Sequence, residues 1–379
     1  MDLIKIQDRF VGKNQPIFII AEAGVNHNGD INLAKKLVDV ASESGADAIK
    51  FQTFKAEDIA TEEAGMAEYQ KKNTGKEEKQ LELLKRLELS EKNHILLKEY
   101  CKEKNIIFSS TPHSGTKDVD FLDNLGVSFF KIGSGDLTNL PYLYYIAEKN
   151  KPVIISTGMG DINEIMEAYE ALNSTGNNKI IFLHCGTNYP LDDKFTNLRA
   201  INTIKNKINT LVGYSDHTTE ISASILAVNL GACVIEKHFT LDKNLPGPDH
   251  KASLEPNELK DLVRAIRLIE NKNFKDEEAI DFLNNNGFDL NPDIKQMLGN
   301  GIKEPFDFES KIAQIARKSV VAGRDIKAGK ILNEDDLNAK RPGNGLSPKY
   351  MFGKYNRVIG KKLKVDLKKD QQIKLEYLE

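Results

Sequence analysis

The 379-residue sequence has few cysteines, no long apolar run and little net charge. Its three cysteines, Cys101, Cys185 and Cys233, are widely spaced and odd in number, which argues against a disulfide framework and suits a reducing compartment. No apolar run approaches the roughly 20 residues of a membrane helix. The opening segment MDLIKIQDRF also lacks the apolar region of a signal peptide. We therefore expect a cytoplasmic protein with no membrane partner.

The formal net charge is only −3, so no overall positive field favours nucleic acid as a partner. The sequence is 40% hydrophobic and 29% charged, which is typical of a globular protein. Its length exceeds the roughly 250–300 residues that one hydrophobic core usually supports. We expect one large and one small domain.

Eight apolar runs rich in β-branched residues alternate with amphipathic segments. They cover residues 16–24, 47–54, 105–112, 128–135, 152–158, 179–186, 210–216 and 233–241. Continuous apolar strands separated by helices indicate a parallel sheet that helices cover. Eight such units within residues 1–270 match an α/β fold of the (β/α)8 TIM-barrel type. An open doubly wound sheet is the alternative, but no G-x-G-x-x-G motif follows the first run.

Polar residues recur at the carboxyl ends of these runs, which meet at one mouth of a barrel, where active sites lie. They are Glu22, Lys50, Thr111, Lys131, Ser134, Thr157, His184, Ser215, His217 and His238. This repeated placement predicts an enzyme whose site lies in the barrel mouth.

His217 and His238 end neighbouring runs. Adjacent parallel strands lie about 4.8 Å apart, so both imidazoles could bind one ion. Two imidazoles with open positions suit a catalytic Mn²⁺ or similar ion. A structural zinc site would require close-spaced cysteines. Hydrogen bonding within the mouth is the alternative role for each histidine.

Lys50 and Lys131 extend from the second and fourth runs, and nearby hydroxyl groups can add hydrogen-bond donors. A buried lysine pair without an anion is costly, which points to a phosphate or carboxylate ligand. The alternative is that both lysines reach the solvent at the barrel rim. Glu22 could act as a general base, or it could form a salt bridge to Lys50 or Lys131.

Three further segments, which lie outside the predicted barrel strands, are expected to form a lid, a linker and a small C-terminal domain. The polar segment 55–80 is long enough to be a partial lid over the mouth. Residues 271–313 are expected to be a linker with some helix, and residues 314–379 a small β-rich domain. In that domain Arg341 could bind a carboxylate, amide or sugar oxygen, or could be a solvated turn residue. His94 lies in a helical pattern and is expected at the surface.

Several motifs resemble the sialic acid synthase family in the family's order along nearly the whole chain. They are IIAEAGVNHNGD, IKFQT, SSTP, KIGSGD, STGM, GYSDHT, EKHFTLD, GPDHKASLEP and KRPGNGLSP. The resemblance implies a TIM barrel followed by a small antifreeze-protein-like (SAF-type) domain, within a domain-swapped homodimer. It implies metal-dependent condensation of phosphoenolpyruvate with N-acetylmannosamine to form N-acetylneuraminate and phosphate by C–O cleavage. The alternative is a legionaminic acid synthase that uses 2,4-diacetamido-2,4,6-trideoxymannose.

The same resemblance implies a role for each matching residue. Glu22, His217 and His238 would be catalytic, and the two histidines would bind a divalent ion, Mn²⁺ or Mg²⁺. Phosphoenolpyruvate would bind to Lys50, Thr111, Lys131, Ser134 and Ser215. The sugar would contact Asp136, Tyr189, Asp249 and, from the partner chain, Arg341. Asp136 stands where many family members carry Glu, so its shorter carboxylate would reposition the sugar.

Overall fold

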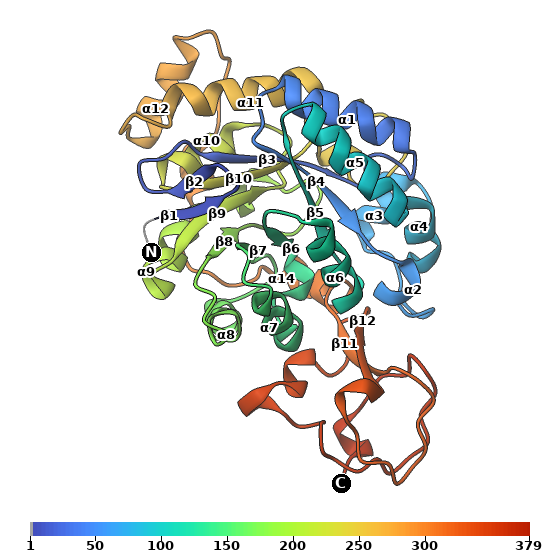
Figure 1. The fold of residues 1–379 in the computed structure, drawn as a ribbon. Coiled ribbons are helices and arrows are strands. Elements are labelled where there is room, and N and C mark those ends of the chain that lie inside the picture. Colours follow the sequence, from blue (N-terminus) through green and yellow to red (C-terminus); the bar gives the residue numbers. More distant parts are fainter. Residues whose placement is uncertain (1–2) are drawn as a thin grey trace.

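The computed structural model describes residues 3–379 and has eight parallel strands around a central axis (Figure 1). The strands run in the order β5-β4-β3-β10-β9-β8-β7-β6, and the two terminal strands, β5 and β6, also lie against each other. Each strand falls inside one of the eight apolar runs, which confirms the predicted TIM barrel. Their bounds are β3 (Phe18–Gly24), β4 (Ala48–Thr53), β5 (Ile107–Pro112), β6 (Phe130–Ile132), β7 (Val153–Ser156), β8 (Ile180–His184), β9 (Leu211–Asp216) and β10 (Val234–His238).

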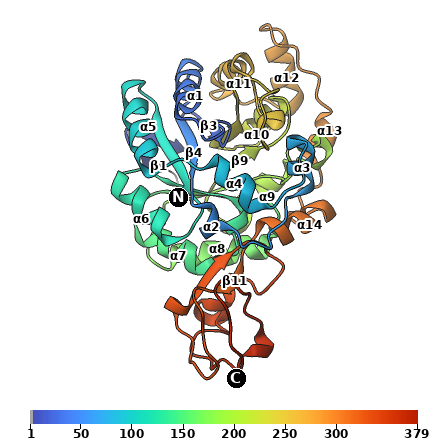
Figure 2. The same ribbon diagram turned by 90° about the vertical axis from the view of Figure 1, so that its right-hand side faces the viewer.

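Helices pack around the outside of this sheet (Figures 1 and 2). They are α1 (Ile31–Glu43), α5 (Glu91–Glu103), α6 (Thr116–Leu125), α7 (Leu140–Glu148), α8 (Ile162–Asn173), α9 (Ala200–Ile208), α10 (Ser222–Asn229) and α11 (Pro256–Ile269). Helix α8 begins at a capping box, in which the Asp161 carboxylate accepts the backbone N–H groups of Asn163 and Glu164. Across residues 3–379 no helix combines the length and apolarity needed to cross a membrane.

The expectation for His94 was wrong, because its side chain is buried. It lies with Leu97 and Cys101 on the inner face of α5, at the i, i+3 and i+7 spacing of a packed helical stripe. Its ring nitrogens lie 3.0 Å from the Ser90 carbonyl oxygen and 3.3 Å from the Gln52 carbonyl oxygen. Burial lowers the pKa of His94, and the neutral imidazole can donate its one N–H to only one of these two carbonyl oxygens.

An N-terminal hairpin closes the amino end of the barrel. It consists of β1 (Leu3–Ile6) and β2 (Arg9–Gly12), which pair antiparallel. Its buried residues Ile4, Ile6 and Val11 belong to one apolar cluster with residues from the first halves of the barrel strands. The sequence analysis did not predict this hairpin. Since this end is plugged, the opposite end remains for a site.

The segment 55–80, expected to be a lid, contains the short helices α2 (Ala56–Ile59) and α3 (Glu68–Thr74) and runs into a third, α4 (Gln80–Leu87). These helices have a small apolar core of their own. Ile59, Tyr69 and Gln80 from this segment line the cavity at the barrel mouth, so the segment forms one of its walls.

The rest of the chain runs from the barrel into a small domain that projects from one side (Figures 1 and 2). The elements after the barrel are α12 (Asp276–Asn284), α13 (Ile294–Leu298), α14 (Asp307–Ala316), β11 (Ser319–Ala322) and β12 (Leu337–Lys340). Strands β11 and β12 pair antiparallel, and the domain has a separate apolar core. The boundary expected at residue 314 falls inside α14.

Candidate active site

A cavity at the carboxyl ends of the barrel strands contains nearly all the residues that the sequence singled out. Those that line it are Glu22, Lys50, Thr111, Lys131, Ser134, Tyr189, Ser215, His217, His238, Asp249 and Arg341. The lid and helix α14 supply the remaining walls through Tyr69, Ile312 and Ile315. Residues from all parts of the chain thus meet in one buried space.

The floor of the cavity contains two buried lysines and two buried carboxylates in alternation. Lys50 Nζ lies 2.5 Å from Glu22 Oε2 and 3.8 Å from Glu236 Oε2. Lys131 Nζ lies 3.2 Å from Glu236 Oε1. Thr111 Oγ1 accepts a hydrogen bond from Lys50 Nζ at 2.9 Å. The pairing of Glu22 with Lys50 considered from the sequence is therefore present, and two carboxyl groups of the chain itself lie against the lysine pair.

Burial affects the two carboxyl groups differently. It raises the pKa of Glu22 to about 8; Lys50 opposes this rise and the charge of Glu236 adds to it. Burial also acts to raise the pKa of Glu236, but Lys131 and Lys50 together outweigh it and hold that pKa at about 2. Glu236 is therefore the fixed negative charge of the floor. Glu22 titrates near neutral pH, as a general acid or base must.

His217 and His238 lie side by side, with ring centroids 5.6 Å apart. His217 Nδ1 donates to the Gly186 carbonyl oxygen at 2.6 Å, which leaves the lone pair on Nε2. His238 Nδ1 is buried and has no hydrogen-bond partner within residues 3–379. Burial lowers the pKa of both imidazoles, so both are neutral.

These two neutral imidazoles fit a divalent ion, because each keeps a nitrogen lone pair for coordination. Within residues 3–379 no cluster of three or more His, Cys, Asp and Glu side chains has ligand spacing. A metal held by His217 and His238 would therefore keep open positions for water and substrate oxygen, as a catalytic rather than a structural ion does.

The other end of the cavity is built around Tyr189. Its ring centroid lies 4.2 Å from that of His217, 5.5 Å from that of His238 and 5.1 Å from that of Tyr69 in the lid. Asn73 Nδ2 ties the lid to this region by donating to the carbonyl oxygen of Tyr189 at 3.0 Å. Aromatic faces beside polar groups are suited to a ligand with both apolar and polar substituents.

Arg341 reaches the cavity from the same chain, whereas the partner chain was expected to provide it. Its backbone N–H donates to the Ile59 carbonyl oxygen at 2.8 Å, and its carbonyl oxygen accepts from Thr61 at 3.0 Å. The segment after β12 thus pairs with the lid, and this pairing places the guanidinium at the cavity wall.

Asp136, expected to contact the sugar, is not among the residues that line the cavity, and its carboxylate is engaged elsewhere. Its Oδ1 atom pairs with Lys318 Nζ at 3.0 Å and accepts from Asn139 Nδ2 at 3.0 Å. Lys318 Nζ also donates to the His113 carbonyl oxygen at 2.7 Å. Both charged side chains are buried, so Asp136 fastens the C-terminal segment to the barrel.

Among the cavity residues that sequence reasoning did not identify are Tyr69 and Ser156, and it also missed the central role of Glu236. A signal existed for Glu236, because it precedes His238 by two residues in β10 and so shares its face of the strand. Ser156 ends β7 and accepts a hydrogen bond from Lys131 Nζ at 2.8 Å. Tyr69 lies in the lid, where no strand period marks which side chains face the cavity.

Comparison with known proteins gives the family of the chain. Residues 37–277 match the NeuB family, and residues 317–379 match the SAF domain. The chain is 47% identical over 358 residues to the N,N'-diacetyllegionaminic acid synthase of Campylobacter jejuni, covering 94% of this chain and 98% of that protein. It is 42% identical to the synthase of the same name from Legionella pneumophila, covering 97% and 96% of the two chains.

The fold agrees as well. The crystal structure of the spore coat polysaccharide biosynthesis protein SpsE from Bacillus subtilis has a TM-score of 0.80 and 32% sequence identity, covering 100% of this chain and 99% of that chain. The chain belongs to the NeuB family of sialic-acid-type synthases and carries the SAF domain of that family. It is an enzyme of the class that condenses phosphoenolpyruvate with an amino sugar.

Proposed function

We propose that the protein condenses phosphoenolpyruvate with 2,4-diacetamido-2,4,6-trideoxymannose, releasing phosphate and forming N,N'-diacetyllegionaminic acid. The likeness to two synthases of that name over nearly the whole chain supports this acceptor. N-acetylmannosamine, the acceptor first expected from the motifs, is the competing substrate. The two sugars differ in bearing an acetamido group or a hydroxyl at C4, and a methyl or a hydroxymethyl group at C5.

The groups on the buried floor of the cavity support binding of phosphoenolpyruvate there. Lys50 and Lys131 supply two cations, and Thr111, Ser134 and Ser215 supply hydroxyl donors around them. Since Glu22 and Glu236 hold the lysines in place beforehand, an arriving phosphate or carboxylate meets positioned donors and need not order them. Short charge-assisted hydrogen bonds to both lysines would then fix its orientation.

His217 and His238 would hold a divalent ion, Mn²⁺ or Mg²⁺. Such an ion supplies Lewis acidity toward the aldehyde oxygen of the sugar when bound. At the other end Tyr189, Asp249 and Arg341 would contact the hydroxyl and acetamido groups of the acceptor. Arg341 presents a planar set of donors, which suits amide and hydroxyl oxygens.

The proposed chemistry has three balanced steps. The enol carbon of phosphoenolpyruvate bonds to the aldehyde carbon, and the aldehyde oxygen becomes a hydroxyl by taking the proton of protonated Glu22. Water then adds to the cationic carbon that bears the phosphate ester, and the water proton passes to Glu22. Finally the C–O bond to phosphate breaks while the hydroxyl left by the added water gives its proton to the departing phosphate, which leaves the keto group and inorganic phosphate. Lys50 and Lys131 stabilise the charge on the departing phosphate.

The proposal includes a homodimer, in which two copies of the chain exchange their C-terminal domains. Exchange of the C-terminal domain in a homodimer would place the same Arg341 contact across two chains. Light scattering in solution checks this part, and a monomeric mass for active enzyme would contradict it.

The direct test is phosphate release from phosphoenolpyruvate with Mn²⁺, with the two acceptors assayed in parallel. We expect turnover with the diacetamido sugar that a chelator abolishes and added metal restores. His238→Ala should be inactive, whereas His184→Ala removes a buried imidazole outside the cavity lining and should remain metal-dependent. A clear preference for N-acetylmannosamine would overturn the acceptor, and silence with both sugars would overturn the function.

A further inference from the structure

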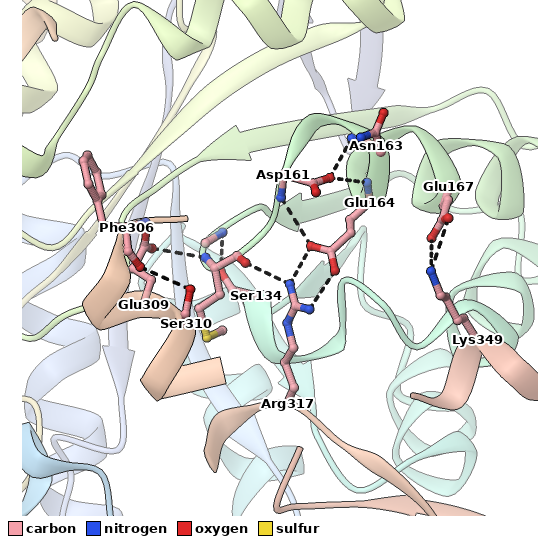
Figure 3. Close-up of polar contacts among 12 residues, drawn as sticks. Ser134, Asp161, Asn163, Glu164, Glu167, Phe306, Glu309, Ser310, Arg317 and Lys349 are labelled. Atoms are coloured by element: carbon pink, nitrogen blue, oxygen red, sulfur yellow. Dashed lines mark hydrogen bonds and ion pairs between the residues drawn. The ribbon is translucent and has the colours of Figure 1, made fainter. Parts of the chain in front are cut away.

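Helix α14 packs against the loops that follow β7 and β8, and one buried carboxylate on this helix, that of Glu309, accepts hydrogen bonds from both loops (Figure 3). Building on the proposed function, we propose that Glu309 is a positioning residue. It holds two loops so that the phosphoenolpyruvate end and the sugar end of the cavity are formed together. Glu309 lies outside the cavity lining and outside every motif noted in the sequence.

Glu309 is 2% exposed and accepts three backbone hydrogen bonds. Its Oε1 atom accepts the N–H of Met159, after β7, at 3.1 Å, and that of Thr187, after β8, at 2.8 Å. Its Oε2 atom accepts the N–H of Phe306 at the start of α14, at 3.1 Å. A buried carboxylate is tolerated where N–H groups satisfy it. One side chain therefore joins the helix to both loops.

Met159 shows why such a tie is needed. Its φ of 61° is left-handed, a conformation that is unfavourable for a non-glycine residue and persists only where its surroundings fix it. The tail fixes both of its backbone polar groups, because Glu309 takes the N–H and Arg317 Nη2 donates to the carbonyl oxygen at 2.9 Å. Arg317 is itself held by Glu164 through two bonds of 2.7 Å (Figure 3).

The two loops connect directly to residues assigned to the substrates. Gly158, beside Met159, donates its N–H to Ser134 Oγ at 3.0 Å, so the first loop sets the hydroxyl at the phosphoenolpyruvate end. A Cβ on Gly158 would lie 2.1 Å from Thr187 Oγ1, which shows that the two loops touch at this glycine. Thr187 precedes Tyr189 by two residues, so the second loop sets the sugar end.

A purely local role is the competing explanation, since the Glu309 carboxylate also caps its own helix through Phe306. The substitutions Glu309→Gln and Glu309→Ala separate the two roles. Gln can keep one oxygen toward Met159 and Thr187, but its NH₂ group then faces the Phe306 N–H, so the cap is lost and the loops are held. Ala loses the cap and leaves both loop N–H groups buried without an acceptor.

The matched control is Lys349→Ala. Lys349 also joins the tail to the barrel, through Glu167 on α8 at 3.2 Å, but it touches neither loop (Figure 3). The readouts are the Kd of phosphoenolpyruvate by calorimetry, hydrogen exchange at the Met159 and Thr187 amides, melting temperature, and KM and kcat for both substrates. The full-length chain is used throughout.

We expect Glu309→Ala to raise the phosphoenolpyruvate Kd about 10- to 100-fold, as misplacement of a binding group by about 1 Å can do, and to speed exchange at both amides. Glu309→Gln should lower the melting temperature while its Kd stays within about threefold of wild type, since the loop bonds remain. Lys349→Ala should leave the Kd and both amides unchanged. Equal Kd values in wild type and Glu309→Ala would overturn the proposal, as would unchanged amide exchange.

The exchange readout needs no turnover, so the proposal and the proposed function fail in different ways. Wild-type protein that binds phosphoenolpyruvate but condenses it with neither sugar would refute the function alone. Faster exchange in Glu309→Ala, with loss of phosphoenolpyruvate binding, would still support the positioning role.

Discussion

Replacing Asp249 by Asn should stabilise the protein, and the gain should depend on pH. Asp249 is 9% exposed and lines the cavity. Burial raises the pKa of its carboxyl group to about 6, and Lys50 offsets only part of that rise. An unfolded Asp titrates near 3.9, so the difference of about 2 pH units corresponds to about 3 kcal/mol.

The sign follows from the raised pKa. Folding favours the protonated carboxyl group, so this favourable contribution is complete below about pH 4 and is lost as the pH rises through about 6. Asn cannot ionise and keeps the neutral state at every pH. We therefore expect Asp249→Asn to gain less than about 1 kcal/mol at pH 4 and about 3 kcal/mol above pH 7.

Denaturant unfolding of both proteins between pH 4 and pH 8 measures this difference in the free energy of unfolding. Asp289→Asn, which removes an exposed carboxylate, controls for the loss of one charge and should change stability by less than about 0.5 kcal/mol. A stability difference for Asp249→Asn that stays constant with pH would refute the burial argument. So would a variant that is less stable than wild type at pH 8.

The same substitution should weaken the enzyme. Ionised Asp249 accepts hydrogen bonds from sugar hydroxyls more strongly than an amide does, so the KM for the acceptor should rise about tenfold or more. We expect the variant to be more stable but less active, because the buried charge of Asp249 destabilises the folded protein and is retained for binding the substrate.

Three further predictions test other parts of the site. His238→Ala should abolish the rise in melting temperature that Mn²⁺ produces in the wild type, and an unchanged rise would contradict metal binding by the histidine pair. Arg341→Lys should raise the acceptor KM about tenfold while phosphoenolpyruvate binding is kept, because Lys lacks the planar donor pair; calorimetry and steady-state kinetics separate the two effects. Asn73→Ala removes the bonds to the carbonyl oxygens of Tyr189 and Pro248. At about 1 kcal/mol for each bond, this loss should make residues 60–80 more sensitive to limited proteolysis, and equal cleavage rates would refute the lid attachment.

The barrel could be predicted because its strands are continuous apolar runs. The length of these runs and the segments between them indicate strands that alternate with helices. The same regularity identified the mouth residues, since a polar group at a strand end interrupts an apolar pattern. The N-terminal hairpin could not be predicted, because its two strands are very short. Ile4, Ile6 and Val11 pack on a surface that exists only once the barrel is closed. Nothing local in the sequence marks them as its plug.

The contacts between distant segments were harder to predict for a related reason. Asp136 follows a strand end like the true lining residues, and its pairing with Lys318 depends on how the C-terminal segment docks. Glu309 lies in a segment expected to be a linker, where a single buried carboxylate leaves no periodic signal. Arg341 was correctly placed at the mouth, but the chain that supplies it depends on the path after α14.

The sequence correctly indicated that Lys50 and Lys131 need negative charge nearby. It did not indicate that carboxyl groups of the same chain lie beside them. Two buried ammonium groups do require counter-charges, and the chain already places two carboxyl groups beside them, of which Glu236 supplies an ionised one before any ligand binds. These carboxylates differ in kind: Glu236 is held ionised, whereas burial raises the pKa of Glu22 to about 8. An incoming phosphate adds negative charge beside Glu22 and further favours its protonated form. The site can thus accept a highly charged substrate because one of its own carboxyl groups is protonated, and that residue, Glu22, can give up this proton and take one from water during the reaction.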